Sequence, residues 1–261
     1  MEKILIQVVI NRFARLTIAL ATLVFHGAAS QAMVGNAPPA PAALARHMVM
    51  ITHASGGYCT GTVIARDLVL TAGHCGDPND VHKLIQFSPS GQTVFLDVVR
   101  AVRHPQFDLK AYLNHRATAD VAVLKLAQPL PASYAPAPLA PAEKRFVVGD
   151  RLIVAGFGLS VIGDGRTGGT LRAATLTVTG QPGTLQIRLV DPAGNNKTFG
   201  MGTCNGDSGA PAFDSTGAVV GVVSWATAPN NEDGCGGLTG ITPLPLYRVW
   251  IVEMMRKFST P

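Results

Sequence analysis

Three short segments contain side chains that could together carry out nucleophilic chemistry. A serine hydroxyl is a weak nucleophile at neutral pH unless a base takes its proton, and histidine is the side chain that titrates closest to pH 7. A carboxylate beside the imidazole would orient the ring and stabilise its charged form. These groups occur in residues 70–75 (Leu-Thr-Ala-Gly-His-Cys), 118–124 (Thr-Ala-Asp-Val-Ala-Val-Leu) and 204–211 (Cys-Asn-Gly-Asp-Ser-Gly-Ala-Pro). We therefore take His74, Asp120 and Ser208 as the candidate base, orienting acid and nucleophile.

The serine segment also contains groups that a reaction at a carbonyl carbon would need. Glycines on both sides of Ser208 permit unusual backbone dihedral angles and expose its hydroxyl. The backbone N–H groups of Gly206 and Ser208 can converge on one point and stabilise a developing oxyanion. Each segment alone is a weak signal, because an isolated histidine is usually structural and a Gly-Asp-Ser-Gly tetrapeptide is usually a turn. Their joint occurrence in the order His, Asp, Ser decides the interpretation.

Two cysteines accompany these segments, Cys75 beside His74 and Cys204 four residues before Ser208. With them, the chain resembles the trypsin/chymotrypsin-like serine peptidase family from Met33 to its C-terminal end. The resemblance implies an all-β fold of two six-stranded antiparallel barrels, with the active site in the cleft between them. It also implies hydrolysis of peptide bonds in protein or peptide substrates, through an acyl-enzyme intermediate and without a cofactor. The order His, Asp, Ser argues against a lipase or esterase, which needs Gly-x-Ser-x-Gly and the order Ser, Asp, His.

The chain has four cysteines, Cys59, Cys75, Cys204 and Cys235. An even number in an exported chain favours disulfides, and four cysteines allow three pairings. Because none of the spacings resembles a zinc site, we expect no metal. The family resemblance implies the pairs Cys59–Cys75 and Cys204–Cys235.

The resemblance also assigns the substrate-binding positions. In trypsin-like relatives an aspartate lies six residues before the nucleophile, at the base of the primary pocket, and here that position is Gly202. A small, uncharged pocket predicts a preference for small-to-medium apolar residues before the cut. Two acidic residues, Glu232 and Asp233, lie near the cysteine at the rim of the pocket. A negative charge supplied to the pocket by this loop is therefore the alternative. The predicted positions are Gly202, Thr203, Ala226 and Gly240 for the pocket, and Ser224, Trp225 and Ala226 for a strand that pairs with extended substrate.

A further feature of the family is activation by a newly freed apolar N-terminus. Its α-ammonium pairs with the aspartate before the nucleophile, here Asp207. Residues 33–36 (Met-Val-Gly-Asn) resemble that N-terminal motif and begin 41 residues before His74, close to the family spacing. We therefore predict an ion pair between the α-amine of Met33 and Asp207, formed without a separate activating protease. The alternative is a later start after Arg46.

Residues 1–32 have the pattern of a signal peptide. Basic residues precede a mostly apolar stretch at 16–25, and Ser30-Gln31-Ala32 fits the small-x-small rule for signal peptidase. The apolar stretch is too short to span a membrane comfortably, which takes about 20 residues. An uncleaved anchor helix is the alternative, because residues 4–10 are also apolar. The pattern predicts a secreted protein, extracellular or, in a bacterium, periplasmic.

The elements that must position the candidate site are mostly short strands. The chain contains 28 Gly and 18 Pro among 261 residues, which favours many turns over a helical bundle. Apolar runs broken by turn residues occur at 47–52, 62–64, 68–70, 94–102, 121–126, 152–155, 171–178, 185–190 and 218–224. That spacing is typical of an antiparallel barrel or sandwich.

The domain boundaries follow from proline and from one helical pattern. The proline-rich stretch 129–141 reads as an extended linker, which divides the peptidase domain 33–261 into barrels at 33–140 and 141–244. Residues 33–46, rich in Ala and Pro, are also expected to be extended. After Pro245, apolar residues recur every fourth position and predict a C-terminal helix over 245–261. These residues are Leu246, Trp250, Met254 and Phe258.

Composition also limits the partners. The net charge of +5 is mild and no run of five like charges occurs, so we expect no nucleic-acid partner. We expect a monomer with no membrane association after signal cleavage. A catalytically dead family member acting as a binding module is the alternative from another class, although the chain keeps all three candidate residues. The remaining histidines, among them His53 and His82, have no catalytic motif around them and are interpreted as structural or solvent-facing.

Overall fold

The first half of the chain forms a closed antiparallel barrel in the computed structural model, which describes residues 33–87 and 93–259. The strands close in the order β1-β2-β3-β6-β5-β4. They are β1 (Met48–His53), β2 (Tyr58–Ala65), β3 (Leu68–Thr71), β4 (His82–Phe87), β5 (Thr93–Arg103) and β6 (Ala122–Leu126).

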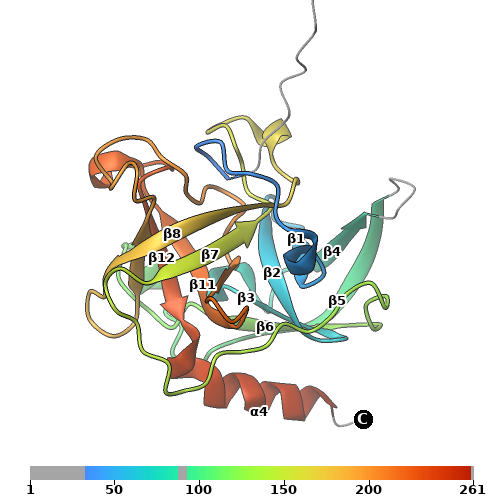
Figure 1. Ribbon diagram of the computed structural model, residues 1–261. Coiled ribbons are helices and arrows are strands. Elements are labelled where there is room, and N and C mark those ends of the chain that lie inside the picture. Colours follow the sequence, from blue (N-terminus) through green and yellow to red (C-terminus); the bar gives the residue numbers. More distant parts are fainter. Residues whose placement is uncertain (1–32, 88–92, 260–261) are drawn as a thin grey trace, which may run out of the picture.

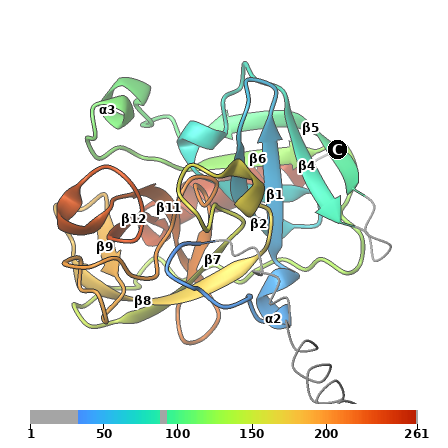
Figure 2. The same ribbon diagram turned by 90° about the horizontal axis from the view of Figure 1, so that it is seen from above.

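A second closed antiparallel barrel follows, with the strand order β10-β11-β12-β9-β8-β7. Its strands are β7 (Arg151–Gly156), β8 (Arg172–Gly180), β9 (Ile187–Val190), β10 (Pro211–Phe213), β11 (Val219–Ala226) and β12 (Leu238–Pro243). Figures 1 and 2 show the two barrels side by side, the first in blue to green and the second in yellow to red. The predicted fold of two six-stranded barrels is confirmed.

Strands at the junction of the barrels bury both of their faces. In β3, Val69 lies in the core of the first barrel, whereas Leu68 and Leu70 pack into a cluster between the barrels. In β11, Val223 lies in the core of the second barrel and Val222 in the same junction cluster. Successive side chains of a strand point to opposite faces, so these strands appear in the sequence as continuous apolar runs. Each such side chain contributes about 1.5–3 kcal/mol on burial.

The C-terminal helix α4 (Arg248–Ser259) closes the junction from below in Figure 1. Its buried residues are Ile251, Met254 and Phe258, which pack into the junction cluster. The helix prediction is confirmed, but Leu246 is not part of the buried face. It is 53% exposed and belongs to the preceding 3-10 turn η4 (Leu244–Tyr247). The apolar repeat was therefore extended one turn too far toward the N-terminus.

The remaining helical elements are short. They are α2 (Ala42–Ala45), η1 (Gly73–Cys75), α3 (Leu109–Leu113), η2 (Gly165–Thr167) and η3 (Pro229–Asn231). The expected extended conformation of 33–46 is wrong at α2, where consecutive Ala and Leu residues favour a helical turn. No helix of the described ranges is long and apolar enough to cross a membrane. The predicted signal peptide lies outside the described residues.

The proline-rich stretch 129–141 is fixed to both barrels by backbone hydrogen bonds. The N–H of Ala137 donates to the carbonyl of Val63 in β2 over 2.8 Å, and that of Ala140 donates to Val219 in β11 over 3.0 Å. Prolines lack the N–H that a sheet ladder requires, so the segment stays outside the barrels and crosses from one to the other. It thereby helps to fix the two halves of the site relative to each other.

Candidate active site

His74 and Asp120 are brought together by the pairing of β3 with β6. Thr71 at the end of β3 is the register partner of Ala122 at the start of β6. His74 lies in η1, directly after β3, and Asp120 lies two residues before β6, so the two side chains share one edge of the barrel. Asp120 is fully buried and accepts hydrogen bonds from the backbone N–H of His74 over 2.8 Å and from its Nδ1 over 2.9 Å.

A third hydrogen bond to Asp120 comes from the second barrel. The register of β11 against β12 shifts between Val223 and Trp225, which makes Ser224 the extra residue of a β-bulge. The hydroxyl of Ser224 donates to Oδ2 of Asp120 over 2.6 Å. The sequence assigned Ser224 only to substrate binding. Its contact with Asp120 depends on the bulge, which the sequence pattern does not reveal.

We expect Ser224→Ala to lower kcat by about 10-fold, because a hydrogen bond to a charged group contributes about 1.5–3 kcal/mol and its loss loosens Asp120. Steady-state kinetics on a chromogenic peptide will measure the effect. The matched control is Ser215→Ala, which removes an exposed hydroxyl in the turn after β10. An unchanged kcat in Ser224→Ala would contradict this role.

Ser208 lies on a turn that packs against the histidine segment. Thr60 in β2 donates its backbone N–H to the carbonyl of Ser208 over 2.8 Å. Gly209 has φ +80° and leaves no room for a Cβ, because Thr71 and the backbone of Ala72 lie against it. The turn therefore requires glycine at this position and places Ser208 beside the segment that leads into His74.

The two N–H groups predicted to form the oxyanion hole have no partner among the described residues. The N–H groups of Asp207 and Gly209 donate to the carbonyls of Cys204 and Val223, whereas those of Gly206 and Ser208 donate to none. Gly206 has φ +95°, and the ring of Tyr58 lies where its Cβ would be. The local backbone thus leaves both donors available to a substrate oxygen.

No hydrogen bond joins Ser208 to His74 within the described part of the chain. Catalytic hydrogen bonds are often long in ligand-free sites and tighten only when substrate binds. The ring of Tyr112, in α3, stacks on His74 with 4.3 Å between centroids. Burial raises the pKa of Tyr112 to about 12, so its hydroxyl stays neutral beside the imidazole. Nothing in the sequence motifs pointed to Tyr112.

Two disulfides fix the loops of the site. They join Cys59 to Cys75 and Cys204 to Cys235, which is the pairing that the family resemblance implied. Cys75 is the residue after His74, and Cys204 opens the segment of Ser208. A closed loop of 16 residues in the first pair corresponds to about 3 kcal/mol of stabilisation in the chain-entropy model.

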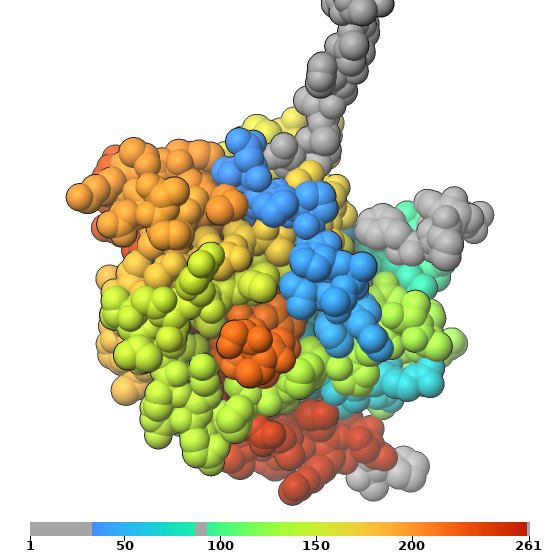
Figure 3. Space-filling view, viewed as in Figure 1, coloured from blue at the N-terminus to red at the C-terminus, as the bar shows by residue number. Residues whose placement is uncertain are grey.

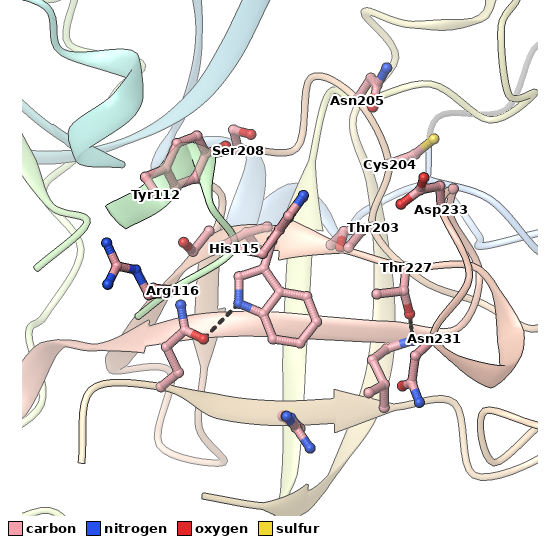
Figure 4. Close-up of a pocket in the computed structure, with 18 of the residues that line it drawn as sticks. Tyr112, His115, Arg116, Thr203, Cys204, Asn205, Ser208, Thr227, Asn231 and Asp233 are labelled. Carbon is pink, nitrogen blue, oxygen red and sulfur yellow. Dashed lines mark hydrogen bonds between the residues drawn. The ribbon is translucent and has the colours of Figure 1, made fainter. Parts of the chain in front are cut away.

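Ser208 opens onto a pocket of about 640 Å³. Four residues that the sequence assigned to substrate binding, Thr203, Ser224, Trp225 and Ala226, line this pocket. Tyr112 contributes to the wall near Ser208 (Figure 4). Gly202 and Gly240 do not line it. Gly202 pairs with Val34, and the indole of Trp225 covers Gly240. Gln186 holds that indole by accepting a hydrogen bond from its Nε1 over 2.8 Å.

The charged side chains that line the pocket are all exposed. They are Arg116, Arg188 and Asp233. Thr203, which also lines the pocket, is fully buried, and its hydroxyl is hydrogen-bonded to that of Thr239 over 2.9 Å. The interior of the pocket is therefore uncharged among the described lining residues.

Comparison with known proteins identifies the family of this site. Residues 33–251 match the family model described as Trypsin. The chain belongs to the trypsin family. Membership makes it a serine-type endopeptidase, a hydrolase that acts on protein substrates.

Individual relatives of this trypsin-family chain are distant. It is 29% identical to Trypsin of Phaedon cochleariae over 226 residues, which cover 78% of this chain and 81% of the relative. It is 29% identical to Kallikrein-14 of Homo sapiens over 210 residues, which cover 76% of this chain and 74% of the relative. The solved structure of human heparin binding protein has a TM-score of 0.69 at 22% identity. The match covers 87% of this chain and 98% of that structure's chain, and it supports the fold.

The aspartate before Ser208 is buried in this trypsin-family chain. Asp207 is fully buried, and its carboxylate accepts the N–H groups of Gly158 over 2.8 Å and Cys204 over 2.9 Å. Burial raises the pKa of Asp207 to about 7, although these two hydrogen bonds oppose the shift. A cation placed beside the carboxylate would favour its ionised form.

The predicted N-terminal motif docks near Asp207. Met33 is fully buried, and Val34 donates its N–H to the carbonyl of Gly202 over 3.2 Å. Val34 also packs with Leu159 and Cys204, which adjoin the segments that hold the Asp207 carboxylate. Figure 3 shows the blue part of the chain, which begins with this motif, lying across the surface of the molecule. In the full-length chain the nitrogen of Met33 is an amide, so no ammonium is present there.

Proposed function

We propose that the protein is a secreted endopeptidase whose catalytic triad is His74, Asp120 and Ser208. The observation that carries the proposal is the environment of Asp120, which is fully buried and accepts hydrogen bonds from His74 and from Ser224 of the second barrel. A carboxylate held in this way keeps the proton of His74 on Nδ1 and leaves Nε2 as the base.

In the proposed mechanism, Ser208 Oγ attacks the carbonyl carbon of the scissile peptide bond while Nε2 of His74 accepts the hydroxyl proton. The N–H groups of Gly206 and Ser208 stabilise the oxyanion. His74 then donates the proton to the leaving amine and the C–N bond breaks. Water attacks the acyl-enzyme by the reverse roles and releases the new carboxylic acid, which regenerates Ser208. Asp120 stabilises the imidazolium throughout.

The edge of β11 is proposed to bind the substrate backbone. Ser224, Trp225 and Ala226 lie at the C-terminal end of β11 and line the pocket beside Ser208. An extended peptide that adds to this edge would gain main-chain hydrogen bonds, with side-chain selection left to the pocket.

We predict that cleavage follows uncharged, small-to-medium apolar residues rather than Arg or Lys. Gly202 carries no carboxylate, and Thr203 and Ala226, which line the pocket, are small and uncharged. The exposed Asp233 contributes little, because exposed ion pairs stabilise by about 0–1 kcal/mol. Profiling of the purified enzyme on a peptide library will measure the preference, with Ser208→Ala as the control for contaminating proteases. A profile dominated by Arg or Lys would refute the prediction, and one dominated by Asp or Glu would implicate Arg116 and Arg188 instead.

We also propose how the N-terminus of the chain is processed. Residues 1–32 are proposed to be the signal peptide, removed on export, and the enzyme is proposed to act as a monomer. Its domain would then be residues 33–261, with barrels at 33–140 and 141–244 and the helix segment at 245–261. N-terminal sequencing of the secreted enzyme tests the start, because Met33 is the first residue expected.

A further inference from the structure

A cross-strand pair of histidines lies outside the catalytic site. His53 at the end of β1 is the register partner of His82 at the start of β4, and the side chains of such partners meet on one face of the sheet. Their rings lie 5.1 Å apart between centroids. Asp80 precedes His82 by two residues, and its Oδ2 lies 4.0 Å from Nδ1 of His53. One nitrogen or oxygen atom of each of the three side chains lies within 4.8 Å of the others.

Both rings contain a buried nitrogen without a partner. Nε2 of His53 and Nε2 of His82 have no hydrogen-bond partner among the described residues, and His82 is only 3% exposed. Leaving a buried polar atom unpaired costs about 1–3 kcal/mol, so two in one cluster call for an explanation. His82 also forms a hydrogen bond with the backbone of Cys75, which holds its ring in place. Metal-bound histidines are commonly held by a hydrogen bond to a carbonyl or carboxylate in this way.

The carboxylate of Asp80 is held in place by Ser55, whose hydroxyl donates to Oδ2 of Asp80 over 2.5 Å. The cation Arg103 is paired with Asp77 at 3.3 Å.

We propose that His53, Asp80 and His82 bind a Zn²⁺ ion. Two imidazole nitrogens and one carboxylate oxygen are a donor set that suits zinc, whereas Ca²⁺ and Mg²⁺ prefer oxygen ligands alone. Zinc bonds of about 2.0–2.2 Å in a tetrahedron place ligand atoms about 3.3 Å apart, so atoms that now lie within 4.8 Å of one another need to approach by at most about 1.5 Å. Water takes the fourth position. Cys59 and Cys75 lie beside His53 but are joined in a disulfide and cannot contribute thiolates.

The bound ion would stabilise the loop that carries His74. It would link β1, the turn containing Asp80 and β4, and His82 in turn is hydrogen-bonded to the backbone of Cys75. His74 is the residue before Cys75, so the site supports the catalytic loop without touching the reacting atoms. The proposal does not rest on peptidase activity.

The experiment titrates ZnCl₂ into the Ser208→Ala protein, which cannot digest itself, by calorimetry and thermal unfolding. We expect one zinc ion per chain. At a hundredfold excess over Kd, Tm should rise by about 5–10 °C. His53→Gln and His82→Gln should each remove most of this shift. His115→Gln, at an exposed histidine, and His74→Ala, at the catalytic histidine, should keep it. MgCl₂ should have no effect.

A second measurement does not depend on the folding of the variants. In NMR spectra of the histidine rings of the Ser208→Ala protein, Zn²⁺ should shift the resonances of His53 and His82 and leave those of His115 in place. The proposal is overturned if no saturable zinc binding occurs. It is also overturned if His74→Ala abolishes binding while both glutamine variants retain it, because the ion then lies in the catalytic site.

Discussion

Replacement of Ser208 by Ala is expected to lower kcat/KM on peptide substrates by at least about 10³-fold, with the fold intact. The substitution removes the only atom that can form the acyl-enzyme in the proposed mechanism. It removes no packing, because the turn is held by the backbone of Ser208 through Thr60 and by the close contacts of Gly209. Steady-state kinetics on a cleaved library peptide, together with the thermal midpoint, will separate lost chemistry from lost stability.

Two further substitutions test the rest of the triad. His74→Ala removes the base, and Asp120→Asn removes the charge that three hydrogen bonds hold in a buried position. Both are expected to match the loss of Ser208→Ala to within about 10–100-fold, because the triad acts as a unit. Near-full activity in Ser208→Ala, with contaminating proteases excluded, would show that the nucleophile is another residue.

The second large effect is expected at the N-terminus. A protein that begins at Met33 should be active, and one that begins a single residue earlier, at Ala32, should be at least about 10²-fold less active. The physical reason is a buried charge: breaking a buried ion pair costs about 3–5 kcal/mol, and Asp207 is fully buried. Only the first protein places an ammonium at the docked end of the Met33–Val34 segment. Equal activity of the two proteins would overturn the proposed activation.

The pH dependence supplies a signature of the same ion pair. Without an ammonium, the pKa of Asp207 is raised from 3.8 to about 7, so the folded protein holds a proton that the unfolded chain releases. The free energy of unfolding of the Ala32-start protein should therefore fall as the pH rises from about 4 to about 7. In the Met33-start protein the proposed pair with ionised Asp207 should raise the pKa of the amine above its free value of about 8. The activity that depends on this pair should be present below that raised pKa and be lost as the pH rises through it.

Asp207→Asn provides the matched control for both proteins. It should abolish the activity difference between the two starts and remove the fall in stability between about pH 4 and pH 7. If the free energy of unfolding of Asp207→Asn still falls over this pH range, the group that titrates is not Asp207.

The apolar runs of the strands predicted an antiparallel barrel or sandwich, and the family resemblance implied the two six-stranded barrels that the structure contains. Runs such as 68–70 and 121–124 are apolar on both faces, since their side chains pack into a barrel core on one face and the junction on the other. The strands that were missed have weaker signals. β10 has three residues and continues directly from the serine turn, and β12 follows a glycine-rich stretch that resembles a loop. β4 begins with two polar residues.

The sequence predicted candidate site residues where the proposed chemistry restricts the residue type. It did not predict contacts that depend on how the side chains pack. His74, Asp120 and Ser208 stand in motifs whose residue types follow from their proposed roles. The stacking of Tyr112 on His74 and the contact of Ser224 with Asp120 depend on a loop helix and a bulge, neither of which leaves a local pattern. Gly240 was assigned to the pocket, but the indole of Trp225 covers it. Side-chain positions of this kind are set by three-dimensional packing.

Covalent labelling tests whether Ser208 is the activated nucleophile. The Met33-start protein is treated with a fluorophosphonate reagent, which reacts with a serine only when its hydroxyl is activated, and the adduct is located by peptide mass spectrometry. A single adduct is expected on Ser208, with labelling lost in Ser208→Ala and strongly slowed in His74→Ala. The absence of any adduct, or an adduct on another serine that persists in Ser208→Ala, would contradict this role of Ser208.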